Sequence, residues 1–491
     1  WYHNWLKEFE IDDINAPLSE ENKRRQGKRV ALLSDIITFC QQRDLRPVIV
    51  IPPLHPYLAS KLSGIFRENY IYSFINKANT ARVPFYDYMD DERFASDKYI
   101  FYERCRGKIF YGDISKRTGT DMRICILTQP LHTNYGGLLQ AYALQTVLKR
   151  MGHEVWTEDR KENKKTLFQN IKYLAKIVLG PVRHLYYPTS KERSIISQYT
   201  DPFIKKYITT TEPVFSQQKS GLERYGFEGY IVGSDQVWRP CYSFGLRNYF
   251  LDFTEGMNVK RVAYAASFGT DEWEFTPEET RECAILAQKF DAISVREDSG
   301  VILCKNYLGV NAVQLLDPTM LLDKEDYLKI VRQEQERKHR GKIMVYILDA
   351  SSEKQQIVQY VSSKLGLQSF SVMPECKFSD VGSKGLKKCI FPSVTEWLKG
   401  FEDADFIVTD SFHGTVFSII FNKPFVAIAN KSRGLSRFTS LLRMFNMENR
   451  LIFTYNRDDI DRLIDLPIDY TVVNQRRIEE QKKAYEFLSK I

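Results

Sequence analysis

Residues 122–152 read MRICILTQPLHTNYGGLLQAYALQTVLKRMG, and they carry the strongest signal of the fold class. The apolar run MRICILT predicts a buried strand, QPLHTNYGG predicts a polar turn, and the remainder predicts an amphipathic helix that ends at Gly152. A strand, a glycine turn and a helix in this order open a doubly wound parallel sheet. We therefore expect an α/β fold whose first unit begins at Met122.

The alternation of strands and helices continues downstream. Strands are predicted at HEVWTED, YGFEGYIVGSD, VKRVAYAASFG, FDAISVRE and AVQLLDPTMLL, with the helix EETRECAILAQKF between two of them. A second series begins at Lys342 and comprises KIMVYILD, a helix at 352–365, LQSFSVM, the helix SVTEWLKGFEDA, DFIVTD, the helix GTVFSIIF and PFVAIAN. We therefore predict two Rossmann-like domains, 122–325 and 326–491, the second with a terminal helix, and a ligand cleft between them.

Residues 1–121 read as an incomplete α/β segment. A helix within 18–44 precedes the strand RPVIVIPPL, and a helix near 57–70 precedes the strand VPFYDYM. The segment weakly resembles the carboxy-terminal part of SGNH-type hydrolases and acyltransferases. It lacks their early GDS-like turn, and the late sequence YIFYERCRG has no histidine, so we expect it to be non-catalytic. The chain begins with Trp1, and Met122 resembles a start codon, which indicates a fragment or a fusion.

The composition is that of a globular protein with a mild positive charge. The 491 residues are 43% hydrophobic, and 70 basic against 62 acidic side chains give a net charge of +8. This excess suits an anionic small molecule or membrane face, and we expect no nucleic-acid partner. No run is long enough to span a membrane, residues 1–10 lack the basic-then-apolar order of a signal peptide, and no CxxC pair or acidic cluster resembles a metal site. We predict a cytoplasmic address, reduced cysteines and no metal.

Residues 160–195 are rich in lysine and arginine. Leu167, Ile171, Leu174 and Ile177 fall on one face of a predicted helix within this segment. Two readings stay open: a solvated surface helix packed on its domain, and a basic amphipathic element that makes peripheral contact with an anionic membrane. On the second reading the protein lies at the inner face of the membrane.

Two turns at predicted strand ends carry polar groups in the first series. Asn134, Gly136 and Gly137 open a helix, where bare backbone amides and the helix dipole can approach an anion; tight packing is the alternative. Ser234 and Asp235 follow the strand YIV within GSDQVW, and loop capping is the alternative for them. Both turns are candidate ligand contacts.

Two later turns carry an arginine and a histidine. Arg296 ends a strand, and its planar fork suits a carboxylate or phosphate, unless it pairs internally with Glu297. Asp410, Ser411 and His413 lie between the strand DFIVTD and an apolar helix. A histidine at a helix start is well placed to meet an anion. We therefore expect His413 to be functional.

These four turns, in this order, resemble the polysaccharide pyruvyl transferase family. The resemblance runs from Met122 to about residue 470 through NYGGLLQAYAL, GSDQVW, SVRE, LDPTMLL and TDSFHGTVFSIIFNKPFVAI. It implies two Rossmann-like domains similar to those of GT-B glycosyltransferases. It also implies phosphoenolpyruvate as the donor substrate, with no separate cofactor, and a sugar hydroxyl pair as the acceptor. By the same resemblance, Arg296 holds the anionic donor and His413 is the catalytic histidine.

One position departs from the family pattern. Many members have an arginine two residues before the histidine, where this chain has Ser411. One charge-assisted donor, worth roughly 1.5–3 kcal/mol, is then missing from the expected anion site. Lys423, Lys431, Arg433 or Arg437 follows in the sequence and could replace it, and we include Ser411 and Lys431 among the candidate substrate contacts. Equally, this branch of the family could use a different donor or acceptor.

The residue types suit the implied chemistry. The methylene carbon of phosphoenolpyruvate must gain a proton, which a histidine can supply, and Asp235 or Asp410 could accept the proton of the acceptor hydroxyl. The primary hypothesis is a bacterial transferase that adds a pyruvyl ketal to a cell-surface polysaccharide precursor, with a lipid-linked glycan as one possible acceptor. Two alternatives stay open: a GT-B glycosyltransferase that uses a nucleotide sugar, and a non-catalytic glycan-binding or assembly protein.

Overall fold

The chain divides into two compact units, Trp1–Gly119 and Thr120–Ile491. The computed structural model describes residues 122–161, 186–215, 221–243, 245–334, 336, 338–430 and 434–491, and in the upstream unit 67–80, 83–87, 49–51 and scattered positions at 24–42. In the upstream unit, β1 (Ile49–Ile51) pairs in parallel with β2 (Phe85–Asp87). The π-helical turn Glu68–Tyr72 and α5 (Ser73–Ala78) lie between these strands in the chain, as a parallel crossover requires.

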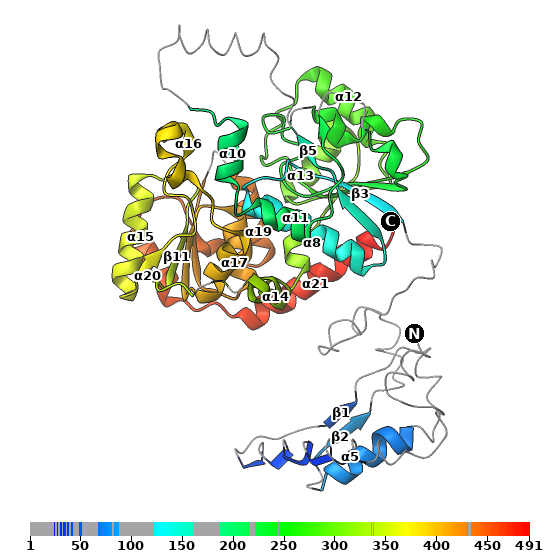
Figure 1. Cartoon of the computed structure of the whole chain (residues 1–491), viewed down its shortest axis with the longest axis vertical. Coiled ribbons are helices and arrows are strands. Elements are labelled where there is room, and N and C mark those ends of the chain that lie inside the picture. The colour runs from blue at the N-terminus through cyan, green and yellow to red at the C-terminus, as the bar shows by residue number, and fades with distance from the viewer. Residues whose placement is uncertain are drawn as a thin grey trace. The chain divides into compact units, whose positions relative to one another are not determined.

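The larger unit contains two large parallel sheets and one short parallel pair, β5 (Arg160–Lys161) and β6 (Val214–Phe215) (Figure 1). The first has the order β10-β9-β8-β7-β3-β4, and its strands are β3 (Arg123–Leu127), β4 (Glu154–Thr157), β7 (Gly229–Val232), β8 (Lys260–Ala266), β9 (Ala292–Val295) and β10 (Val313–Gln314). The second has the order β12-β11-β13-β14-β15, and its strands are β11 (Ile343–Tyr346), β12 (Ser369–Phe370), β13 (Phe406–Thr409), β14 (Phe425–Ile428) and β15 (Leu451–Ile452). We refer to the parts built on these sheets as the first and second lobes.

Both sheets are doubly wound, which confirms the expected fold class. The first strand of each series, β3 or β11, lies between the next two strands of its sheet, so the winding reverses there. The central strands β7, β13 and β14 are buried along their whole length. Helices cover both faces of such sheets, and for this reason their strands are short continuous apolar runs.

Helices connect the strands in both lobes. The expected helices are present: EETRECAILAQKF overlaps α12 (Pro277–Ala287), which begins one residue earlier, 352–365 is α15 (Ser352–Leu365), and SVTEWLKGFEDA contains α17 (Val394–Asp403). The others used below are α8 (Tyr135–Arg150), α10 (Ser190–Ile196), α11 (Asp201–Tyr207), α13 (Asp298–Leu303), α14 (Lys324–Glu334), α18 (Phe412–Ile420), α19 (Leu435–Met444), α20 (Arg457–Asp465) and α21 (Tyr470–Leu488).

The sequence AVQLLDPTMLL differs from the prediction. Only Val313–Gln314 is strand, and Pro318–Leu321 forms a 3-10 turn. Pro318 lacks the amide that a central strand would need, and the side chain of Asp317 caps the turn by accepting a hydrogen bond from the amide of Thr319. The chain therefore bends just after the sheet edge.

The two lobes share one hydrophobic core. Its buried residues come from β3 and α8 in the first lobe and from β13, α17 and α18 in the second. At the start of α8, the ring of Tyr135 stacks on Trp397 with centroids 5.4 Å apart, and its hydroxyl donates to the carbonyl of Pro392 (2.9 Å). The last helix, α21, returns to the first lobe, where Gln481 donates to the carbonyl of Met320 (2.7 Å). The lobes are thus packed together through apolar side chains.

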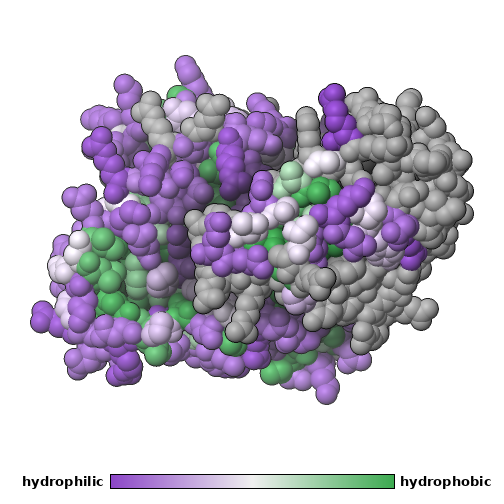
Figure 2. Space-filling model, turned by 90° about the horizontal axis from the view of Figure 1, so that it is seen from below, coloured by the Kyte–Doolittle hydropathy of each residue, from purple (hydrophilic) through white to green (hydrophobic). Residues whose placement is uncertain are grey.

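Most of the basic segment 160–195 lies outside the described residues, including the predicted helix of Leu167 and Ile171. Its described end carries α10, which lies against the second lobe: Ser383 donates to Glu192 (2.5 Å), and the amide of Phe391 donates to the carbonyl of Ile196 (3.0 Å). Among the described residues, no helix has the length and apolar character needed to cross a membrane. The face in Figure 2 is mostly hydrophilic where it is described, with small hydrophobic patches.

Candidate active site

The four predicted turns meet where the strand ends of the two sheets face each other. Nη1 of Arg296, after β9, lies 3.3 Å from Oγ of Ser234, after β7. His413, after β13, packs against Gly136, after β3. The carboxylate of Asp317, three residues after β10, lies close to both Arg296 and His413 and so connects the two pairs of residues. We call the group of Arg296, Asp317, His413 and Ser234 the cluster.

The carboxylate of Asp317 is the centre of the cluster. Its Oδ2 accepts hydrogen bonds from Nη1 of Arg296 (2.8 Å) and from Oγ of Ser234 (2.9 Å), and its Oδ1 accepts from the amide (3.0 Å) and hydroxyl (2.7 Å) of Thr319. Nε2 of His413 lies 3.6 Å from Oδ2. Burial alone would raise the pKa of Asp317, but the facing His413 and Arg296 outweigh it and hold that pKa well below its usual range. Asp317 is therefore ionised.

His413 stands in the first turn of α18 and is packed against the start of α8. A Cβ atom at residue 136 would lie 2.0 Å from its Nδ1 and 2.3 Å from its Cγ, so the imidazole occupies the space that a side chain at Gly136 would need. His413 is 6% exposed, and its Nε2 has no hydrogen-bond partner among the described residues. Buried polar atoms rarely lack a partner, so this nitrogen is a candidate ligand contact.

Arg296 is buried in the same place. Its Cζ lies 4.5 Å from the centroid of the Phe412 ring, and its Nε and Nη2 have no hydrogen-bond partner among the described residues. Burial would lower the pKa of Arg296, but the carboxylates of Asp317, Glu297 and Asp235 outweigh it and raise that pKa. The guanidinium therefore stays charged. Its Nε lies 3.7 Å from Oε1 of Glu297, so the internal ion pair weighed in the sequence analysis is present, and Nη2 is the donor left for an outside acceptor.

Two further carboxylates of the first lobe act on Arg296. Asp235 has a φ of 82°, a left-handed conformation that costs energy for a residue with a side chain, and its Oδ1 accepts from the amide of Gln236 (2.9 Å). Glu297 accepts from the hydroxyl of Ser267, and its Oε2 has no partner among the described residues. Burial raises the pKa of Glu297 despite the opposing effect of Arg296. Strained and buried polar groups of this kind are typical of functional sites.

Asn134 and Ser411 hold the two helix starts at the cluster. Oδ1 of Asn134 accepts from the amide of Gly137 (3.2 Å) and caps α8. Oγ of Ser411 accepts from the amide of Gly414 (3.4 Å) and caps α18. Both residues thus have the capping role of serine and asparagine at helix starts, next to the residues that approach each other.

Asp410 lies under the loop that follows β11. Its Oδ1 accepts from the amide of Leu348 (2.6 Å), and its Oδ2 accepts from the amide of Asp349 (3.1 Å) and from Nζ of Lys354 (2.6 Å). The carboxylate is fully buried with these donors. Asp410 therefore organises the second lobe, and its oxygens are less available to a substrate proton than those of Asp235.

The cations named as replacements for a family arginine lie in different places. Lys423 donates to the carbonyls of Glu402 (3.0 Å) and Ala404 (2.6 Å). Lys431 and Arg433 lie outside the described residues. Arg437 is buried, and its Cζ lies 5.5 Å from the centroid of the same Phe412 ring that Arg296 contacts. Among the described candidates, Arg437 is the one at the cluster.

Sequence reasoning missed Asp317 as a site residue. Asp317 belongs to LDPTMLL, for which the apolar pattern predicts a strand. A carboxylate within a predicted strand is not expected at the end of that strand, where ligands bind. The signal was present nevertheless, because Pro318 stops the strand and leaves Asp317 beyond β10, as Arg296 stands beyond β9. Phe412, between Ser411 and His413, was likewise not predicted to contact Arg296, because the sequence analysis used it only as part of TDSFHG.

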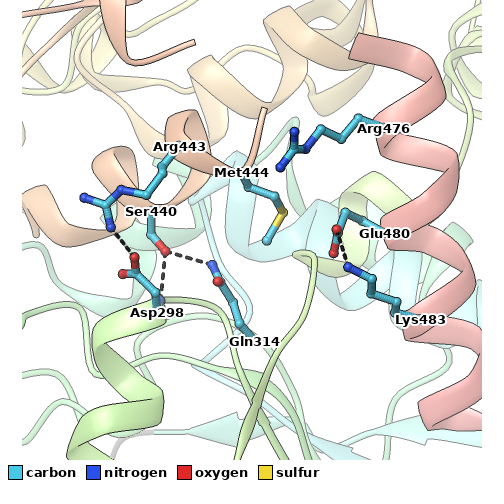
Figure 3. Close-up of a pocket in the computed structure, with 8 residues that line it drawn as sticks. All are labelled: Asp298, Gln314, Ser440, Arg443, Met444, Arg476, Glu480 and Lys483. Atoms are coloured by element: carbon cyan, nitrogen blue, oxygen red, sulfur yellow. Dashed lines mark hydrogen bonds and ion pairs between the residues drawn. The ribbon is translucent and has the colours of Figure 1, made fainter. Parts of the chain in front are cut away.

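A cavity of about 380 Å³ opens beside the cluster (Figure 3). Its described lining comes from α13, β10, α19 and α21: Asp298, Gln314, Ser440, Arg443, Met444, Arg476, Glu480 and Lys483. Met444 also borders a much smaller space lined by Arg296, Asp317 and Phe412. Met444 thus lines both the outer cavity and the small space at the buried charges.

The cluster is suited to an anion rather than to a metal ion. Nη2 of Arg296 and Nε2 of His413, neither with a hydrogen bond to a described residue, are buried in one place, and guanidinium groups bind carboxylates and phosphates through hydrogen bonds. No group of three or more His, Cys, Asp or Glu side chains that could hold a metal occurs in the part of the chain that the structure describes.

Solved structures with a similar fold include a glycosyltransferase and an epimerase. A glycosyltransferase from Rickettsia africae is 11% identical, with 75% of this chain and 94% of that chain covered, at a TM-score of 0.38. A UDP-GlcNAc 2-epimerase from Neisseria meningitidis, bound to UDP-GlcNAc, is 11% identical, with 75% and 100% covered, at a TM-score of 0.41. No curated protein matches the sequence.

A family model matches a large continuous part of the chain. The model of the polysaccharide pyruvyl transferase family matches residues 134–432. The matched region begins at the Asn134 cap, contains Arg296, Asp317 and His413, and makes up more than half of the chain. This chain belongs to the polysaccharide pyruvyl transferase family.

Proposed function

We propose that this protein transfers the pyruvyl group of phosphoenolpyruvate to a pair of sugar hydroxyls on a cell-surface polysaccharide precursor, forming a ketal and releasing phosphate. The family implies a transferase that acts on polysaccharide. The observation that supports the donor is the buried Nη2 of Arg296, which makes no hydrogen bond to a described residue, together with Nε2 of His413, which lies 3.6 Å from the same Asp317 carboxylate that holds Arg296. A donor with a carboxylate and a phosphate supplies the acceptors that these groups need.

In the proposed reaction, Arg296 binds an anionic group of the donor, and Asp317 keeps the guanidinium in place. Protonated Nε2 of His413 gives its proton to the methylene carbon, which becomes the methyl group. A sugar hydroxyl oxygen bonds to C2 and passes its proton to a base, for which we propose Asp235. The second hydroxyl then displaces phosphate from C2, and its proton leaves with the phosphate. One hydroxyl proton thus restores the histidine, through the base, and the other appears on phosphate.

The decisive measurement is the product released by the purified chain in the presence of a glycan acceptor. Phosphate released from phosphoenolpyruvate supports the proposal, whereas a nucleoside diphosphate released from a nucleotide sugar would indicate the glycosyltransferase alternative. Glycan binding without any release would indicate the non-catalytic alternative. A lipid-linked acceptor and a free glycan should be compared, because the acceptor class follows from the family only at the level of polysaccharide.

His413→Ala and Arg296→Ala separate the two proposed roles. Loss of the proton donor should lower kcat about 10²–10⁴-fold. Loss of the guanidinium should mainly raise the donor KM, because it binds donor and transition state alike. His339→Ala is a matched control, since His339 stacks on Phe370 (centroids 4.6 Å apart) outside the cluster and its loss should leave kcat within about twofold. A His413→Ala enzyme with normal kcat would refute the assignment.

A further inference from the structure

The cavity of about 380 Å³ beside the cluster has a lining that the proposed reaction does not yet use. Both lobes and α21 contribute to this lining, and Met444 is its only apolar member among the described residues. Met444 also borders the small space that Arg296 and Asp317 line. A ligand that fills the cavity therefore reaches a side chain at the edge of the proposed reaction centre.

The spacing of residues along α21 explains why its cavity face is polar. The buried residues of this helix recur at intervals of three and four, which places them on one side. Two of them, Arg477 and Gln481, fix that side by donating to backbone carbonyls of the first lobe. Arg476, Glu480 and Lys483 recur at the same intervals on the adjacent side, and Figure 3 shows them projecting from α21 into the cavity.

The charges of the lining do not balance. Its described residues include three cations, Arg443, Arg476 and Lys483, and two carboxylates, Asp298 and Glu480. Arg443 pairs with Asp298, and Lys483 pairs with Glu480. Arg476 is then the cation of the lining that has no ion pair or hydrogen bond to a described residue. Its guanidinium suits an anionic group of a ligand.

Two oxygen acceptors of the lining are also open. The side chain of Glu480 is 12% exposed, and Lys483 binds its Oε1 (2.6 Å), so Oε2 accepts no hydrogen bond from a described residue. Nε2 of Gln314 donates to Oγ of Ser440 (2.8 Å) and to the carbonyl of Arg296 (3.3 Å), while its Oε1 accepts no hydrogen bond from a described residue. Hydroxyl groups can donate to acceptors of this kind.

We infer that this cavity binds the acceptor glycan, and that Arg476 binds an anionic group on that glycan, a phosphate or a sugar carboxylate. The inference rests on the proposed function for the role of the glycan. Sugar hydroxyls supply the donors that Glu480 and Gln314 lack, and the anionic group supplies the counterion that Arg476 lacks. The cavity volume lies within the range of roughly 300–1,000 Å³ that is usual for small-molecule sites. Contact with Met444 places the sugar next to the space at Arg296, where we propose that the donor binds.

The test measures binding to the full chain by titration calorimetry. The probes are the 1-phosphates of glucose, galactose and mannose, the three free sugars, glucuronate and galacturonate. At least one charged sugar should bind about 10- to 100-fold more tightly than its neutral form, because it adds a charged hydrogen bond. Arg476→Gln should abolish this difference and leave Kd for phosphoenolpyruvate within about twofold, and Arg476→Lys, which lacks the planar fork, should give an intermediate loss.

Lys482→Gln is the matched control on the same helix. Lys482 is exposed and does not line the cavity, so its loss removes one positive charge from α21 without removing a proposed contact. Every Kd should then stay within about twofold of its value in the parent chain. An equal loss in Lys482→Gln and Arg476→Gln would mean that the net charge of the helix attracts the probes, and the inference would be wrong.

The remaining outcomes separate the inference from the proposed function. If the parent chain prefers no charged sugar over its neutral form, or if both Arg476 variants keep that preference in full, the inference is wrong even where phosphoenolpyruvate is turned over. If the preference needs Arg476 but phosphoenolpyruvate releases no phosphate with any glycan, the cavity site stands and the proposed donor fails. The tighter class of probe identifies the anionic group as phosphate or carboxylate. Melting temperatures show whether a variant is folded, and the lysine variant decides the matter if the glutamine variant is not.

Discussion

The absence of a side chain at Gly136 lets the imidazole of His413 lie against the start of α8. Gly136→Ala would place a methyl group 2.0 Å from Nδ1, which forces either the ring or the helix to move. A displacement of about 1 Å at a reacting group can cost roughly 10²-fold in rate. We therefore expect kcat to fall about 100-fold or more in this variant, measured as phosphate release.

Gly137→Ala is the matched control on the same turn. Its Cβ would come no closer than 3.2 Å to Nδ2 of Asn134, which the capping side chain can relieve by a small shift. The alanine variant should keep kcat within about threefold, since alanine suits a helix better than glycine. Equal losses in the two variants would mean that the turn needs backbone flexibility rather than room for the histidine.

Asp317 gives a prediction about stability and pH. Its pKa is depressed in the folded chain by His413 and Arg296, so its ionised form stabilises the fold at pH values above about 3.9, the ordinary pKa of an unfolded aspartate. That contribution should be lost progressively as the pH falls below this value. Asp317→Asn should remove it and lower the free energy of unfolding at neutral pH by about 3–5 kcal/mol, because Arg296 would stay buried without its carboxylate.

Urea titrations at several pH values test this prediction. Asp298→Asn is the control, because Asp298 forms a partly exposed ion pair with Arg443 and should contribute under about 1 kcal/mol. An Asp317→Asn chain as stable as the parent at neutral pH would contradict the central role of this carboxylate.

At the residue scale, the sequence predicted which side chains come together at the candidate site. It did not predict the carboxylate that binds them there. Arg296, Ser234, Gly136 and His413 each follow a strand, and parallel strands bring such positions to one edge. The carboxylate that neutralises Arg296 is set by the distances between side chains on different strands. The spacing of residues along the sequence does not give those distances. The pairing of Asp317 with Arg296 therefore became visible only in the folded chain.

At the element scale, α8 couples the lobes through its first residue. Tyr135 is 1% exposed, stacks on Trp397 and donates to the carbonyl of Pro392. Tyr135→Ala should lower the free energy of unfolding by about 3–5 kcal/mol, and Tyr135→Phe, which loses only the hydrogen bond, by about 1 kcal/mol. Tyr199→Phe, on a side chain that is 55% exposed, should change nothing measurable in the same urea titration.

If Tyr135→Phe lowers the free energy of unfolding as much as Tyr135→Ala, the hydroxyl rather than ring packing couples the lobes. Either result bears on activity as well, because the residue after Tyr135 is Gly136, and a shift of the helix start moves the surface against which His413 lies. The loss of kcat should therefore follow the loss of stability across these variants.

Long periodic elements were predictable, and short or interrupted ones were not. The helix at 352–365 has its expected bounds because Ser351 caps it and Gly366 ends it in a left-handed conformation, which are local signals. In AVQLLDPTMLL the apolar run favoured strand, but Pro318 and the cap from Asp317 turned it into a 3-10 turn. LQSFSVM shortened to β12 (Ser369–Phe370) at the edge of its sheet, where few neighbours extend a strand.

At the scale of the whole molecule, the two lobes were predicted, but their shared core was not. A cleft between two α/β series follows from their order along the chain. The packing of α8 on α17 depends on which aromatic residues face each other, and Tyr135 in the sequence read only as part of a polar turn. Because the lobes share apolar contacts, we expect them to unfold together, in one transition seen by both fluorescence and circular dichroism.

The arrangement of units predicts where the activity resides. Every member of the cluster, Arg437, and the whole region matched by the family model lie within Thr120–Ile491. A chain that starts at Thr120 should therefore fold, keep the melting temperature of the matching transition in the full chain, and show the full chain's kcat/KM for phosphoenolpyruvate within about twofold, because no proposed contact to the donor is removed. Calorimetric melting and phosphate release measure both quantities. An insoluble or inactive product would show that residues 1–119 contribute to the fold or to the reaction, and adding them back as a separate chain would then distinguish the two.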